Sequence, residues 1–180
     1  SLIGRILGIE KGTDEYVKAI QKTIEKNGIA VSLEEVAADE KSLWVAYSLT
    51  DENDENDISM NSVQAAVDGE ALALERQYAL NNSTGSEKTA SKYFVAKFNR
   101  SKADRSQKFE IEIGTFQNEN GQVEEKDAYE FSFTADPEAL QADTKEIDIQ
   151  VSIPIEKDQT FLISEMKYNI FGCTISGSFS

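Results

Sequence analysis

Apolar and polar residues alternate with a period of two over most of the chain after residue 28, and this pattern constrains the fold more than any other feature. The clearest runs are Lys108–Phe116 (KFEIEIGTF) and Glu146–Ile155 (EIDIQVSIPI). Successive side chains of a strand point to opposite faces of a sheet, so these runs predict strands with one apolar face. A chain built in this way has to bring its apolar faces together in layers.

Further strand-like runs occur at short intervals, separated by turn residues such as Asp136-Pro137 and the segment Asn118–Gly121 (NENG). They are Ile29–Val36, Leu43–Leu49, Ser91–Asn99, Tyr129–Phe133, Thr160–Ile163 and Lys167–Ile175, with short strands expected inside Ile58–Leu80. Many short strands at such spacing are typical of an all-β sandwich. The predicted fold class is therefore an all-β, immunoglobulin-like β-sandwich.

The first part of the chain has a different period. Thr13 or Asp14 is a suitable N-cap, and Tyr16, Val17, Ile20 and Ile24 recur at helical spacing up to Lys26. Asn27-Gly28 supplies the residues that commonly end a helix. We therefore predict two parts of the chain. Residues 1–28 form a helical segment that contains an N-terminal amphipathic helix, and residues 29–180 form a β-sandwich domain.

Charge and composition exclude several classes of function. The chain has 18 Lys and Arg against 33 Asp and Glu, a net charge of −15, which argues against binding to nucleic acid because phosphate contacts need basic side chains. It contains no histidine, so histidine-dependent nucleophilic catalysis is excluded. One cysteine, Cys173, cannot form a disulfide within the chain. Its apolar neighbours indicate a small buried side chain near a strand rather than an activated thiol.

The acidic segment Asp51–Asp57 (DENDEND) is the one candidate metal site. Asp51, Asn53, Glu55 and Asp57 offer oxygen ligands at alternate positions, as calcium requires. The segment lacks the glycine and the terminal glutamate of an EF-hand loop, so the alternative is a solvated loop between strands. Apart from this candidate calcium site, no cofactor is expected.

Two further groups of residues are candidate catalytic or sugar-binding sites. Glu34-Glu35 and the pair Glu110 and Glu112 are the carboxylate pairs that a glycosidase-like mechanism would need, but exposed carboxylates on a strand are typical of a solvated face. Strand aromatics such as Trp44, Tyr47, Tyr93, Phe94 and Phe98 could stack on sugar rings if exposed, whereas core packing is the ordinary role of such residues. We predict no catalytic residue.

Several segments resemble an extracytoplasmic domain-of-unknown-function family (number 4179) of Gram-positive bacteria. The resemblance rests on Lys26–Trp44 (KNGIAVSLEEVAADEKSLW), on Tyr129–Phe133 (YEFSF) with Asp143–Lys145 (DTK), and on Leu162–Ile175 (LISEMKYNIFGCTI). It covers most of residues 13–175, although Asp51–Arg76 has no clear counterpart. The family provides no catalytic residues to assign to this chain.

The resemblance implies a place and a role. Proteins of this kind carry a short anti-sigma-factor-like segment and one transmembrane helix before the domain, which lies on the extracytoplasmic face of the membrane, often followed by a further immunoglobulin-like domain. Here Ser1 would follow that membrane helix, which makes residues 1–28 juxtamembrane. The expected function is a non-enzymatic sensor or interaction domain of a membrane-anchored regulator, with an unidentified protein or cell-envelope partner. The alternative is a cell-wall or carbohydrate-binding module, in one version calcium-dependent.

Overall fold

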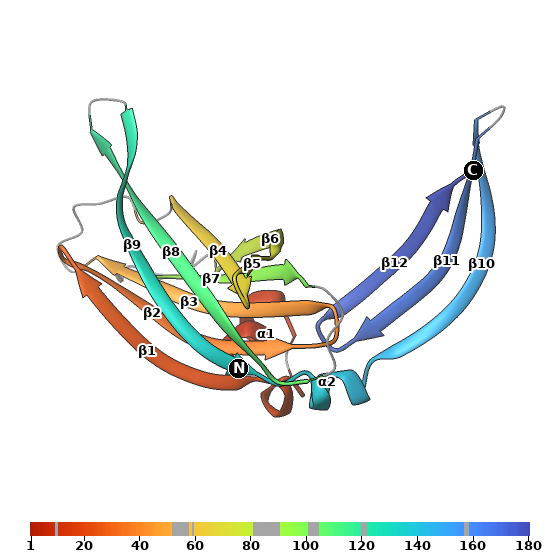
Figure 1. Ribbon diagram of the computed structural model, residues 1–180, viewed down its shortest axis with the longest axis horizontal. Helices are drawn as coiled ribbons and strands as arrows, with labels where there is room; N and C mark the ends of the chain where they lie inside the picture. The colour runs from red at the N-terminus through yellow and green to blue at the C-terminus, as the bar shows by residue number, and fades with distance from the viewer. Residues whose placement is uncertain are drawn as a thin grey trace.

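The protein is described here by a computed structural model that covers residues 1–9, 11–51, 58, 60–80, 91–100, 105–119, 122–156 and 159–180. Its strands form three antiparallel sheets, of five, four and three strands (Figure 1). The first two sheets share one core and form the body of the molecule. The third, drawn in blue, stands at one side of it. The predicted all-β, sandwich-like fold is therefore confirmed.

The five-stranded sheet has the order β1-β2-β3-β7-β6. These strands are β1 (Lys18–Lys26), β2 (Ile29–Ala38), β3 (Ser42–Asp51), β7 (Ser91–Asn99) and β6 (Ala73–Ala79). The central strand β3 is buried along nearly its whole length. Leu43, Val45 and Tyr47 face the core between the two sheets, while Trp44 and Ala46 face a second core on the other side. A strand that is covered on both faces needs apolar residues at successive positions, which accounts for the run LWVAYSL.

The four-stranded sheet closes the other side of the main core, in the order β5-β4-β8-β9. Its strands are β5 (Glu70–Ala71), β4 (Asn61–Val67), β8 (Gln107–Glu119) and β9 (Gln122–Ala135). The alternating residues Phe109, Ile111 and Ile113 of β8 are buried against the first sheet, as their period predicted. Burying a side chain of this size contributes about 1.5–3 kcal/mol, so paired apolar faces stabilise the body.

Lysines of β1 join one edge of the two sheets. Each places its ammonium group on a backbone carbonyl of β9, an edge strand of the other sheet. The pairs are Lys18 with Thr134 (Nζ to O 3.0 Å), Lys22 with Ser132 (3.2 Å) and Lys26 with Ala128. From the other sheet, the buried Tyr129 hydroxyl bonds to the carbonyl oxygens of Lys26 (3.1 Å) and Ile29 (3.2 Å). These bonds use carbonyl groups that an edge strand would otherwise leave to water.

The predicted helix ending at Lys26 is wrong. Only a 3-10 turn, η1 (Asp14–Tyr16), precedes the strand β1, which pairs with β2. Ile20 and Ile24 are four residues apart, a spacing that places them on one face of a helix and equally on one face of a strand. An irregularity between Ala19 and Lys22 further disturbs the period. The N-terminal helix is α1 (Leu2–Leu7), and a boundary at residue 28 would separate two paired strands.

A second, smaller core covers the side of the five-stranded sheet that points away from the main core. It joins α1 to α2 (Glu138–Ala142) through the buried residues Ile3, Trp44, Leu140 and Phe171. The rings of Trp44 and Phe171 lie 5.2 Å apart. Because Phe171 lies in the turn between the last two strands, this core attaches the third sheet to the body.

The three-stranded sheet has the order β10-β11-β12. Its strands are β10 (Lys145–Glu156), β11 (Gln159–Asn169) and β12 (Gly172–Phe179). Figure 1 shows it rising from α2, next to the body. The predicted strand Lys167–Ile175 is divided by a turn at residues 170–171, since the apolar side chains Ile170 and Phe171 pack into the second core instead of continuing the sheet.

Candidate functional site

The predicted calcium segment lies almost wholly outside the described residues. Asn53, Glu55 and Asp57 are not described, and Asp51 is a buried residue at the end of β3. Within the described part of the chain, no group of three or more acidic or thiol side chains is placed to hold a metal ion. The calcium site therefore stays a prediction.

The two carboxylate pairs have different surroundings. Glu35 Oε2 accepts hydrogen bonds from the backbone N–H groups of Leu2 (2.7 Å) and Ile3 (3.1 Å), so it holds the first turn of α1. Glu34 Oε1 accepts one from the Ser48 hydroxyl at 2.7 Å. Glu110 lies exposed on β8, on the opposite face from Phe109 and Ile111. Together with Glu112 it lines a pocket of about 650 Å³. These contacts explain the carboxylates of β2 structurally.

Four of the strand aromatics are buried as expected, whereas the cysteine is not. Trp44, Tyr47, Phe94 and Phe98 are each at most 5% exposed, which makes them core residues, as their ordinary role predicts. Cys173, expected to be buried near a strand, lies on β12 but is exposed. Its apolar sequence neighbours gave a wrong result because the sheet that carries them is not covered.

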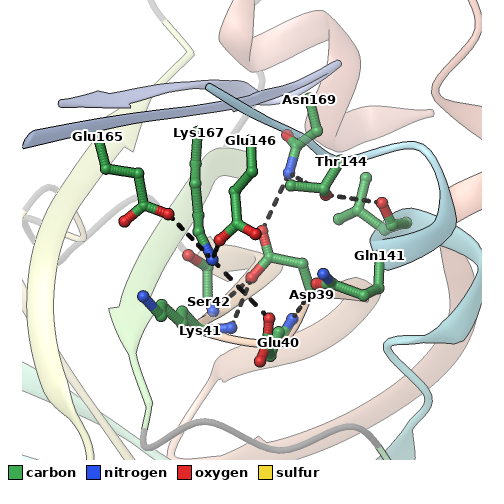
Figure 2. Close-up of polar contacts among 11 residues, drawn as sticks. Asp39, Glu40, Lys41, Ser42, Gln141, Thr144, Glu146, Glu165, Lys167 and Asn169 are labelled. Atoms are coloured by element: carbon green, nitrogen blue, oxygen red, sulfur yellow. Dashed lines mark hydrogen bonds and ion pairs between the residues drawn. The ribbon is translucent and has the colours of Figure 1, made fainter. Parts of the chain in front are cut away.

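The junction between the body and the three-stranded sheet is organised by the turn between β2 and β3. Asp39 Oδ1 accepts the backbone N–H groups of Lys41 (2.9 Å) and Ser42 (2.6 Å), as aspartate commonly does in a turn. Asp39 Oδ2 accepts the side-chain amide of Asn169, at the end of β11, at 3.0 Å. That amide also bonds to Thr144 (3.2 Å), and Gln141 accepts the backbone N–H of Glu40 (3.1 Å). Figure 2 shows these contacts.

Lys167 of β11 is the main charge at this junction. Its ammonium group pairs with Glu146, and it lies 3.6 Å from Glu165 and 3.9 Å from the buried Glu40 of the body (Figure 2). The hydrogen bond with Glu146 raises the pKa of Lys167, although burial acts in the opposite direction. Lys167 therefore stays protonated at neutral pH, whereas a lysine that acts as a base or nucleophile needs a lowered pKa.

A pocket of about 270 Å³ lies between this junction and the five-stranded sheet. Trp44, Lys97 and Glu75 line it from the body, and Thr174 and Ser176 line it from β12. Lys97 is already paired with Glu75 at 2.9 Å, and its ammonium lies 5.6 Å from the centre of the Trp44 ring. The Lys97–Glu75 pair therefore lies within the five-stranded sheet, while the Asp39–Asn169 bond joins the third sheet to the body beside the pocket.

The two faces of the three-stranded sheet differ sharply in chemistry. We call "inner face" the side toward the body, with Glu146, Asp148, Ser152, Leu162, Glu165, Lys167, Thr174, Ser176 and Ser178. We call "outer face" the side away from it, with Lys145, Ile147, Val151, Ile153, Phe161, Ile163, Met166, Tyr168, Cys173, Ile175, Gly177 and Phe179. Irregularities between Asp148 and Val151 and between Ile163 and Glu165 keep both sets in register. The apolar side of this sheet therefore faces solvent.

The outer face holds most of the exposed large apolar side chains of the described residues. Exposed fractions are 41% for Ile147, 47% for Val151, 42% for Ile153, 42% for Tyr168, 58% for Ile175 and 70% for Phe179, with Ile155 beside them at 52%. The face is nevertheless ordered: the Phe161 ring lies 4.9 Å from that of Phe179 and leaves no room for a side chain at Gly177. Contiguous exposed apolar surfaces of this size mark interaction sites in proteins.

The two edges of the same sheet also differ. The edge strand β10 carries Lys145, Glu146, Asp148, Pro154 and Glu156, which are residues that discourage pairing with another strand. The other edge strand, β12, reads GCTISGSF and contains neither charge nor proline. An unprotected edge next to an apolar face is what a partner needs to approach. Sequence reasoning found the alternation of these strands but not this surface.

Comparison with known proteins supports the fold but indicates no activity for this chain. No family model and no curated protein matches the chain. A solved structure, "the conserved domain protein from Bacillus anthracis", matches with a TM-score of 0.57 over 92% of this chain, at 16% identity. The chain spans only 58% of that protein's length. None of the described helices has the length and apolar character to cross a membrane.

Proposed function

We propose that this chain is a non-enzymatic protein-interaction domain that binds through the outer face of the three-stranded sheet. The observation that carries this proposal is the solvent exposure of six large apolar side chains on one ordered face, from 41% for Ile147 to 70% for Phe179. Monomeric proteins rarely leave such a patch open unless it serves an interaction. The protonated Lys167, close to Glu146, Glu165 and Glu40, supports a structural role for the junction rather than a catalytic one.

Binding of an apolar fluorescent dye tests this function on dilute protein. The dye gains fluorescence on exposed, ordered apolar surface, so we expect a strong signal for the wild type. Val151→Asp places a charge on the outer face, midway along β10 and beside Ile163, and should remove most of this signal. Ser152→Asp adds the same charge to the neighbouring residue on the inner face and should leave the signal intact. Equal dye binding by the two variants would overturn the proposal.

The family resemblance extends the proposal to a location. On that basis the domain is an extracytoplasmic part of a membrane-anchored, anti-sigma-like regulator, and its partner is another cell-envelope protein. Protease treatment of intact cells tests this extension: the segment should be digested while an internal control protein survives. Protection of the segment, or an encoded protein without a membrane helix before Ser1, would contradict it.

A cell-wall or carbohydrate-binding module is the second candidate, favoured by Tyr168 and Phe179, the exposed aromatic side chains of the outer face. Aromatic rings on an open surface can stack on sugar rings. Melting temperatures measured with wall glycans, each with and without calcium, test it. A rise that Tyr168→Ala abolishes would support this function, and unchanged melting temperatures would count against it.

A further inference from the structure

From the apolar outer face, which is uncharged from Ile147 to Phe179, we infer the partner: a second copy of this chain, bound face to face through the two outer faces. This inference rests on the proposed function, because it names the occupant of the same surface. Two such sheets would lie about 10 Å apart, as in a β-sandwich, with both bodies on the outside. The arrangement is a closed, two-fold symmetric dimer, the commonest form of protein oligomer.

The available area fits a dimer. The exposed parts of the six outer-face side chains and the neighbouring Ile155 offer on the order of 700 Å² per copy, against roughly 800 Å² per partner in an interface of standard size. The half-buried Phe161, Ile163 and Met166 add to the same surface. Their burial would be driven by the hydrophobic effect, which acts in proportion to area.

The charges of the chain also favour this face over any other. With a net charge of −15, two copies repel each other over most of their surface. The outer face carries the exposed Lys145 at its junction end, opposite Tyr168, and is uncharged from Ile147 on β10 to Phe179 on β12. Glu146, Asp148 and Glu165 lie on the inner face. Two outer faces therefore meet without placing carboxylates against one another, and repulsion between the bodies is screened by salt.

The open β12 edge offers a second way for two copies to associate, but it leaves the apolar face uncovered. Pairing of β12 with β12 of a second copy would extend the sheet and leave a doubled apolar face in water. Face-to-face packing covers the apolar surface instead, and it ends at two copies because the same patch is used on both.

Sedimentation equilibrium over a wide range of protein concentration tests the inference. The wild type should change from the mass of one copy, 20.0 kDa, to that of two, and added salt should favour the dimer. Val151→Asp should raise the dissociation constant at least about 100-fold, because the interface would bury an unpaired charge. Ser152→Asp, with the same change in net charge, should dimerise like the wild type. Ile175→Asp against Ser178→Asp repeats the comparison on β12.

Circular dichroism and melting of the dilute variants verify that each is folded. A wild type that stays monomeric would overturn the dimer, and so would a dimer that Val151→Asp does not weaken or a mass that grows beyond two copies. Monomeric wild type that still binds the apolar dye, with loss in Val151→Asp, would overturn the dimer alone and leave the proposed interaction surface standing for another β-rich partner. Absence of both dimer and dye binding would overturn both proposals.

Discussion

The body and the three-stranded sheet are built from the same kind of alternating strand, but their apolar faces have different surroundings. In the body, the apolar faces are covered by another sheet or by the second core, and Phe98 and Phe109 have no exposed surface. In the three-stranded sheet, the polar face meets the body only at the junction, and the apolar face meets solvent, where Phe179 is 70% exposed. Alternation along a strand specifies two different faces, while the neighbouring layers decide which of them is buried.

The contrast also separates stability from interaction. Apolar residues of the body stabilise the folded chain alone, because they leave water when the chain folds. Those of the outer face stabilise the chain only when something covers them. The junction of Asp39, Asn169 and Lys167 lies between these two regions and fixes the third sheet through its polar face.

The largest expected effect is the difference in the free energy of unfolding between two phenylalanine-to-alanine variants. Phe98→Ala removes a fully buried ring of the main core and should lower the free energy of unfolding by about 3–5 kcal/mol. Phe179→Ala removes a mostly exposed ring and should cost less than about 1 kcal/mol in dilute protein. Urea denaturation followed by circular dichroism measures both. If Phe179→Ala were as costly as Phe98→Ala, the outer face would already be covered in the single copy.

A smaller effect is expected at the junction. Asp39→Ala removes the acceptor of the Lys41 and Ser42 backbone N–H groups and of the Asn169 amide, and should cost about 1–3 kcal/mol. Asp148→Ala, on the exposed inner face, is the control and should change stability by less than about 0.5 kcal/mol. Amide hydrogen exchange should show faster opening of β11 in the first variant only. Equal exchange in both would contradict the role given to Asp39.

The smallest effect concerns pH and the body alone. Burial raises the pKa of Tyr129 to about 12, above the value of about 10 for an unfolded tyrosine. The folded state then holds this proton more tightly, so its contribution is complete below pH 10 and is lost as pH rises toward 12. Melting temperatures should fall over that range, and the stability gap between the wild type and Tyr129→Phe should narrow. A gap that stays constant over that range would contradict this assignment.

Much of the fold could be predicted, because alternation is a local property of the sequence. Phe109, Ile111 and Ile113 are buried on one face of β8, as their period indicated. The first strand was missed since Ile20 and Ile24 satisfy the spacing of a helix and of a strand equally. The break between β11 and β12 was missed since it depends on the contact between Trp44 and Phe171, which are distant in sequence.

The candidate site was less predictable than the fold for a physical reason. The outer face is visible in sequence as Val151, Ile153 and Ile175, but alternation alone indicates that such residues are buried. Their exposure arises because none of the described residues forms a layer opposite them, and the polar bonds of the inner face to the body decide which side is left open. Cys173 shows the same limit, since its apolar neighbours predicted burial and the structure exposes it.

Cys173 provides the most direct test of the central claim, that the outer face is open in a single copy and closes on association. It is the chain's one cysteine, and it lies opposite Tyr168 of β11 on that face. Its rate of reaction with a thiol reagent should approach that of the denatured chain in dilute protein and fall as concentration rises. In Val151→Asp the rate should stay fast at every concentration. A slow rate that does not depend on concentration would show that the face is covered within one copy, and would contradict the account.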